Sequence, residues 1–113
     1  MYSVNVTETI AVAHKLPGVP VCERLHGHNL KIEVMVESLH CNSQNMVVDF
    51  RIIKDTIKEL DHQYLNDIDG LNMPTAETIA EYLYRKLEKD VHPAKVSFIR
   101  IWESEKAYVE FRV

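Results

Sequence analysis

Apolar and polar residues alternate along the first fourteen positions of the chain. Even-numbered positions from Tyr2 to Val12 are mostly apolar, with Glu8 as the exception, and the odd-numbered ones are mostly polar. A period of two indicates a strand with one face on the core. The same alternation returns over residues 26–37. We expect these two segments to pair as a long hairpin, with the break between them at Pro17-Gly18.

The period changes to that of a helix in the middle of the chain. Asp49 is the expected N-cap of a first helix, and its apolar stripe would comprise Phe50, Ile53, Ile57, Leu60 and Tyr64. Thr75 is the expected cap of a second, with Glu77 in the first turn, where the helix dipole favours a negative charge. The stripe of this second helix, which should stop before Pro93, comprises Ala76, Ile79, Ala80, Leu83 and Leu87.

The sequence predicts a second hairpin near its end, formed by residues 95–103 and 106–113 with the turn at residues 104–105. Val96, Phe98 and Trp102 share one parity in the first of these strands, and Ile99 and Ile101 share the other. Both faces of this strand should therefore be covered, one by the helices and one by a neighbouring subunit. The order ββααββ predicts an α+β fold, an antiparallel four-stranded sheet with two helices on one face.

Three histidines continue the apolar faces of the first hairpin. His14 ends the face of the first strand, and His26 and His28 begin that of the second. If the strands pair antiparallel, the three imidazoles converge. Three imidazole ligands with one open coordination position are typical of a catalytic zinc site, so we predict that these residues bind Zn²⁺.

Composition narrows the class of protein. The chain has 113 residues, which predicts a single domain over residues 1–113, and its net charge is −4. With no long run of lysine or arginine, we expect no nucleic-acid partner. We also expect no membrane segment and no signal peptide. The only two cysteines, Cys22 and Cys41, indicate free thiols and a cytoplasmic protein; Cys41 lies in a polar loop and suggests no role.

Several polar residues near these elements have more than one interpretation. Cys22 could be a fourth metal ligand that closes a structural site, a reactive thiol beside an open site, or a small buried residue. Asp61 and His62 could form an acid/base pair or merely end a helix at the surface. Glu103 continues an apolar parity, which favours a ligand contact, although hairpin ends are often solvated.

A family resemblance bears on these alternatives. The motif Cys-x-x-x-His-Gly-His-Asn at residues 22–29, with Ala-x-Ala-His at residues 11–14, resembles the 6-pyruvoyltetrahydropterin synthase and 6-carboxytetrahydropterin synthase family. Later stretches match the same family in type and order, namely residues 48–50, 60–62, 74–77 and 102–104. The similarity covers nearly the whole chain.

The resemblance implies a role for each candidate residue. Zinc would be held by His14, His26 and His28. Cys22 would be the catalytic thiol, and Asp61 and His62 its acid/base partners, contributed by a neighbouring subunit. Substrate contacts would come from Glu103, which would anchor the pterin ring, and from Thr75 and nearby backbone. We suggest Lys15 and Arg24 for the phosphates.

The same resemblance implies the tunnelling fold, in which three subunits close a barrel, two trimers stack into a hexamer, and active sites lie between subunits. The implied substrate is 7,8-dihydroneopterin triphosphate. The spacing from Cys22 to His26 resembles the branch that forms 6-carboxytetrahydropterin and acetaldehyde for 7-deazaguanine synthesis. Glu23 also fits Glu-x-x-His-Gly-His of members that form a hydroxymethylpterin for folate synthesis, and pyruvoyl formation is a further alternative. The rival from another class is a non-catalytic binding module with a closed Cys/His₃ zinc site.

Overall fold

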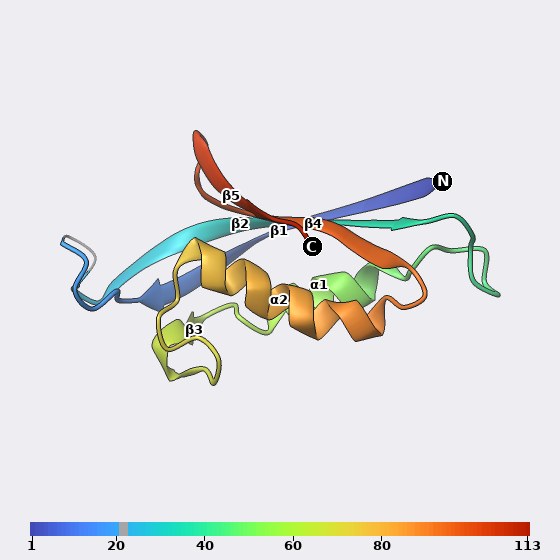
Figure 1. Cartoon of the computed structure of the whole chain (residues 1–113). Helices are drawn as coiled ribbons and strands as arrows, with labels where there is room; N and C mark the ends of the chain where they lie inside the picture. The colour runs from blue at the N-terminus through green and yellow to red at the C-terminus, as the bar shows by residue number, and fades with distance from the viewer. Residues whose placement is uncertain (21–22) are drawn as a thin grey trace.

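The first hairpin forms the frame of the molecule. The computed structural model describes residues 1–20 and 23–113, and in it β1 (Tyr2–His14) pairs antiparallel with β2 (His26–Ser38) over the full length of both strands. The pairing runs from Tyr2 opposite Ser38 to His14 opposite His26, as predicted. The residues that follow β1, up to Pro20, extend beyond the helices (Figure 1).

The sheet contains four antiparallel strands and one short addition. β4 (Lys95–Ser104) pairs with β2, and β5 (Ala107–Phe111) pairs with β4, which confirms the predicted four-stranded arrangement. A two-residue strand that the sequence did not suggest, β3 (Gln63–Tyr64), lies parallel to the end of β1. The order across the sheet is β3-β1-β2-β4-β5.

Two helices cover one face of this sheet (Figure 1), as expected. α1 (Phe50–Lys58) packs on β1, and α2 (Ala76–Asp90) packs on β4 and β5. Both expected caps form, because the Asp49 carboxylate accepts from the Arg51 amide at 2.9 Å and the Thr75 hydroxyl accepts from the Thr78 amide at 3.2 Å. Every residue of the predicted α2 stripe is buried.

The predicted stripe of the first helix was too long at both ends. Phe50 is 63% exposed, so it does not join the core. The helix ends at Lys58, and Tyr64 belongs to β3. A helix cannot continue through His62, whose φ is +60°, in the left-handed region. Leu60 is buried, but in the turn that follows the helix.

The predicted parity of β4 was wrong at its start. Phe98 pairs with Met35, but Val96 pairs with Val36, so one residue of β4 is skipped by a bulge. The bulge turns Val96 to the face covered by the helices, where it joins the core cluster with Ile99 and Ile101. Of the three residues predicted to share that parity, Phe98 and Trp102 remain on the face opposite the helices.

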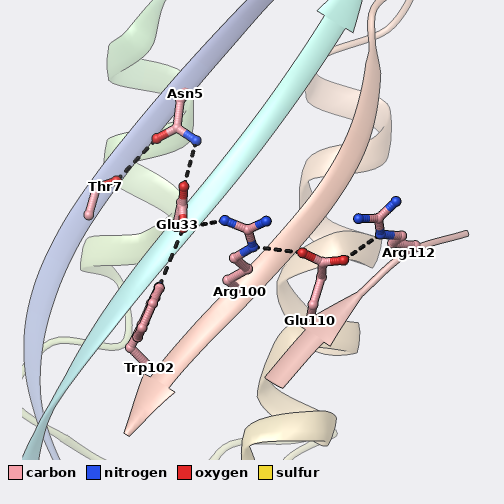
Figure 2. A network of polar contacts seen from close by, with 7 residues as sticks. All are labelled: Asn5, Thr7, Glu33, Arg100, Trp102, Glu110 and Arg112. Carbon is pink, nitrogen blue, oxygen red and sulfur yellow. Dashed lines mark hydrogen bonds and ion pairs between the residues drawn. The ribbon is translucent and has the colours of Figure 1, made fainter. Parts of the chain in front are cut away.

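The other face of the sheet, the open face, is covered by no helix of the described residues and carries charged side chains. Glu33, Arg100 and Glu110 lie directly opposite one another on β2, β4 and β5; we call them the charged row. Arg100 lies between the two carboxylates, with Nε donating to Glu110 at 2.6 Å and Nη1 lying 3.5 Å from Glu33 (Figure 2). Asn5 and Arg112 extend the hydrogen-bonded network to either side of the row.

The helices are short and amphipathic. Within residues 1–20 and 23–113, none has the length and apolar character needed to cross a membrane.

Candidate metal centre

Three imidazoles converge where the first hairpin opens into its loop. His14 lies directly opposite His26 in the sheet register, and His28 follows two positions later on the same face. The ring centroid of His14 lies 4.6 Å from that of His26 and 4.8 Å from that of His28. One ring nitrogen from each residue lies within 4.8 Å of the other two, so the predicted convergence is confirmed.

Backbone carbonyls orient two of the rings. Nδ1 of His14 lies 3.0 Å from the carbonyl oxygen of Pro74, and Nδ1 of His26 lies 2.9 Å from that of Arg24. A carbonyl only accepts, so in the neutral rings Nδ1–H donates and Nε2 keeps its lone pair. Nε2 of His14 lies 2.8 Å from Nε2 of His28. The Nε2 atoms of His14 and His28 therefore face each other, and one ring nitrogen of His26 lies within 4.8 Å of both residues' ligand nitrogens.

The surroundings of His28 favour the neutral form of its ring. His14 is only 2% exposed, and His26 and His28 are half-buried. Burial lowers the pKa of His28, and the charges that His14 and His26 would carry lower it further, while Glu103 acts in the opposite direction. Neutral imidazole is the form that binds a metal ion.

This donor set fits a divalent metal. Two nitrogens on a tetrahedral zinc ion lie roughly 3.3 Å apart, given Zn–N distances of about 2.0–2.1 Å. The observed separations of the ring nitrogens, from 2.8 Å up to 4.8 Å, span that value. Carbonyl acceptors on Nδ1 are the usual support for histidine ligands. His14, His26 and His28 can therefore hold a metal ion.

The predicted thiol, Cys22, lies outside the described residues. Glu23 and Arg24, which follow it, are exposed and lie in a bend. The side chain of Glu23 makes no hydrogen bond or ion pair among those found in the described part of the chain. Arg24 contributes its backbone carbonyl to His26.

Asp61 and His62 lie against the outer edge of β1. The Asp61 carboxylate accepts the Ala11 amide at 2.8 Å, and the His62 amide donates to the Ala11 carbonyl at 2.7 Å. The hydrogen bond from Ala11 is the main reason that the pKa of Asp61 is lowered. Nε2 of His62 lies 3.7 Å from the carboxylate, and this imidazole is 80% exposed. The pair is thus anchored through Asp61 and open to solvent through His62.

Glu103 and Thr75 both lie near the histidines. Glu103 shares the covered face with Ile99 and Ile101 and is exposed at the end of that face, close enough to His28 to affect its pKa. Thr75 is next to Pro74, and its hydroxyl is already used to cap α2. Thr75 therefore lies near the cluster with its hydroxyl engaged by Thr78.

The Pro74 carbonyl is the functional group that sequence reasoning missed. A backbone oxygen has no signature of its own in a sequence. The only available signal was the Pro-Thr start of α2, which places a carbonyl just before a helix cap.

The opposite end of the molecule contains a hollow of about 880 Å³. Its walls include Leu39, Tyr84 and Pro93, together with the exposed residues His40, Cys41 and His92. These last three do not converge on a metal-binding arrangement in the described residues. The three converging histidines and the hollow therefore lie at different ends of the sheet.

Known proteins resemble the chain over most of its length. Residues 3–113 match the family described as 6-pyruvoyl tetrahydropterin synthase. The 6-carboxy-5,6,7,8-tetrahydropterin synthase of Synechocystis sp. is 40% identical over 87 residues, which cover 68% of this chain and 67% of that protein. Dihydroneopterin monophosphate aldolase of Pyrococcus furiosus is 33% identical over 93 residues, which cover 78% of each.

A solved structure shares the fold. The structure of Caenorhabditis elegans 6-pyruvoyl tetrahydropterin synthase superposes with a TM-score of 0.78 at 20% identity, covering 99% of this chain and 95% of the other. The likeness confirms the predicted tunnelling-fold topology of the chain.

Proposed function

The chain belongs to the 6-pyruvoyl tetrahydropterin synthase family, and from that premise we propose that it is a zinc-dependent lyase acting on 7,8-dihydroneopterin triphosphate. The products would be 6-carboxy-5,6,7,8-tetrahydropterin, triphosphate and acetaldehyde, with one water consumed. The observation that carries the proposal is the convergence of His14, His26 and His28. The 40% identity to the Synechocystis 6-carboxy-5,6,7,8-tetrahydropterin synthase supports the choice of product.

The three histidines would hold the zinc ion through their Nε2 atoms. When bound, zinc would supply a Lewis acid that polarises the side-chain oxygens of the substrate. The carbonyls of Pro74 and Arg24 keep the rings of His14 and His26 oriented toward that point. Burial of His14 keeps water from one side of the site.

Proton transfer is proposed for Cys22, Asp61 and His62. Cys22 as a thiolate would remove a proton from the substrate side chain, and His62 would deliver or accept one. Asp61 would stabilise the charged imidazole, since its carboxylate lies 3.7 Å from Nε2. The exposed position of His62 at the edge of β1 suits a partner on a neighbouring copy of the chain.

Substrate contacts are proposed for three residues. The Glu103 carboxylate could accept two N–H groups from the guanidine-like edge of the pterin, and its place on the face of the histidines supports this role. Thr75 would act through the backbone that it caps, and Glu23 through its exposed carboxylate. Lys15 and Arg24 are exposed near the opening of the hairpin and are proposed for the phosphates.

We propose that the active protein is a hexamer, two stacked trimers with sites between subunits. Across the described residues, β3 covers only the end of the outer edge of β1, and β5 pairs with β4 alone. Open strand edges favour pairing with another copy. Light scattering coupled to size exclusion should give the mass of six chains; a monomer would contradict the proposed assembly.

Cytoplasmic location and the 7-deazaguanine pathway belong to the same proposal. The low cysteine content and the free, exposed thiol of Cys41 support a reducing compartment. The family match over residues 3–113 supports a single domain.

A product assay tests the function. The zinc-loaded protein is incubated with 7,8-dihydroneopterin triphosphate, acetaldehyde is trapped as a hydrazone, and the pterins are separated by mass. We expect acetaldehyde and 6-carboxytetrahydropterin in equal amounts, and none with a Cys22→Ala variant that still binds zinc. Absence of any pterin product would overturn the substrate assignment.

A second candidate is cleavage to a hydroxymethylpterin. Glu23, three residues before His26, and the 33% identity to the Pyrococcus furiosus aldolase favour it. In the same assay this reaction would yield hydroxymethylpterin without acetaldehyde, and pyruvoyl formation would yield neither of these.

Cobalt substitution tests the rival structural site, because a thiolate-to-cobalt charge-transfer band would indicate that Cys22 is a fourth ligand.

A further inference from the structure

One amide side chain joins two segments around His14. Asn66 lies in the short 3₁₀ helix η1 (Leu65–Asp67) and is half-buried. Its Oδ1 accepts the Lys15 amide at 2.9 Å, and its Nδ2 donates to the Lys15 carbonyl at 2.9 Å. The same Nδ2 lies 3.4 Å from the carbonyl of Asn72.

Both contacts are next to parts of the metal centre. Lys15 directly follows His14, so its backbone carries the strand end from which that ring projects. Asn72 is two residues before Pro74, whose carbonyl accepts Nδ1–H of His14. Asn66 therefore holds together the backbone that bears the ligand and the loop that orients it.

Strand pairing does not hold the backbone of Lys15 in place. β3 pairs with Val12 and Ala13 and ends at Tyr64, just before the position of the ligand. Beyond that point Asn66 replaces the missing strand, because a side-chain amide offers one acceptor and one donor group, as a peptide unit does. Aspartate could supply the acceptor alone.

We propose that Asn66 is a positioning residue of the metal centre, which fixes the rotation and tautomer of His14 by clamping Lys15 to the segment before Pro74. The inference rests on the metal site of the proposed function and adds a residue to it. Loss of groups that orient a histidine ligand lowers metal affinity by about 10–100-fold. We expect Asn66→Ala to weaken zinc binding by about 10-fold, and Asn66→Asp to fall between Asn66→Ala and the unchanged protein.

Asn42 offers a matched control. Its Oδ1 accepts two backbone amides, from Gln44 at 2.9 Å and Met46 at 3.1 Å, in a loop beside the hollow at the other end of the sheet. Asn42→Ala thus removes a comparable loop-bracing side chain away from the histidines. It should leave zinc affinity within about 2-fold, given that the orientation effect acts through the ligand's own partners.

The experiment uses the full chain and two readouts. Zinc affinity is measured by competition with a chromophoric chelator, and the His14 tautomer in metal-free protein by long-range proton–nitrogen NMR. In the unchanged protein we expect Nδ1–H, and in Asn66→Ala a mixture of tautomers together with the weaker affinity. If Asn66→Ala does not fold, Asn66→Asp carries the test, since it keeps the acceptor for Lys15.

Each outcome decides a different point. Equal zinc affinity and an unchanged His14 tautomer in a folded Asn66 variant overturn the positioning role. Equal weakening in Asn42→Ala overturns it too, because the effect would then be general loosening. If the unchanged protein binds no zinc, the proposed function fails, whereas a tautomer change in Asn66→Ala would still support the clamp on His14.

Discussion

The two faces of the sheet differ in how many polar side chains they carry and in where these lie. On β2 the covered face presents Leu30, Ile32 and Val34, each fully buried, and the open face presents Lys31, Glu33 and Met35 between them. Along the covered face of the first hairpin, polar residues occur at Glu8, which lies 3.6 Å from Lys58 of α1, and at the end where the histidines lie. On the open face they occur throughout, and many of them contact one another.

This difference separates a candidate site from a stabilising network. The charges of Glu33, Arg100 and Glu110 are compensated within the chain, and each side chain is at most 26% exposed. The three histidines contact one another and two backbone carbonyls, and one ring nitrogen from each lies within 4.8 Å of the other two. Charged residues that pair with one another indicate a structural role, whereas several titratable side chains of one kind that converge indicate a ligand site.

We expect the largest effect, a loss of zinc affinity, from replacing a histidine at the end of the covered face. His28→Ala removes one of three ligands, and zinc affinity should fall by more than about 100-fold, beyond the loss typical of orienting groups. Isothermal titration with zinc measures it. His40→Ala, an exposed histidine beside the far hollow, is the control and should bind as the unchanged protein does. Retained tight binding in His28→Ala would remove the metal centre from this position.

Substitutions in the middle of the covered face should lower the free energy of unfolding rather than the zinc affinity. Leu30→Ala leaves a cavity under the helices, and the free energy of unfolding should fall by about 2–5 kcal/mol. Asn29→Ala, next to it on the open face, should change it by less than about 0.5 kcal/mol. Urea unfolding at one fixed protein concentration measures both, because association would otherwise shift the midpoints. Similar losses in the two variants would refute the assignment of the faces.

The smallest effect concerns the charged row and appears in acid. Hydrogen bonds from Arg100 and then Arg112 lower the pKa of Glu110 below its ordinary value of 4.5. Glu110 therefore adds stability at pH values above 4.5, and this contribution is lost as the pH falls through the lower pKa of the folded state. In Glu110→Gln the acid-induced loss of stability should be shallower. Urea midpoints between pH 3 and pH 6 measure it, with Glu105→Gln, at the exposed turn, as the control.

Much of the fold and the metal centre could be predicted from sequence because both depend on local periodicity. A period of two defines the faces of β1 and β2, and antiparallel pairing then brings His14 opposite His26 without further information. Helix caps are equally local, since Asp49 and Thr75 bond amides two and three residues away. These features would be read correctly from short windows of the chain.

Only the tertiary structure decided the features that join distant segments. Asp61 meets Ala11 and Asn66 meets Lys15 across some fifty residues, on either side of the short pairing of β3 with β1. The bulge that moves Val96 to the core depends on how β4 fits against β2. By itself the sequence determined which residues share a face, because side-chain direction follows from backbone periodicity. Which neighbour each face and strand end receives depends on the packing of the whole chain, and so the clamp on His14 emerged only in three dimensions.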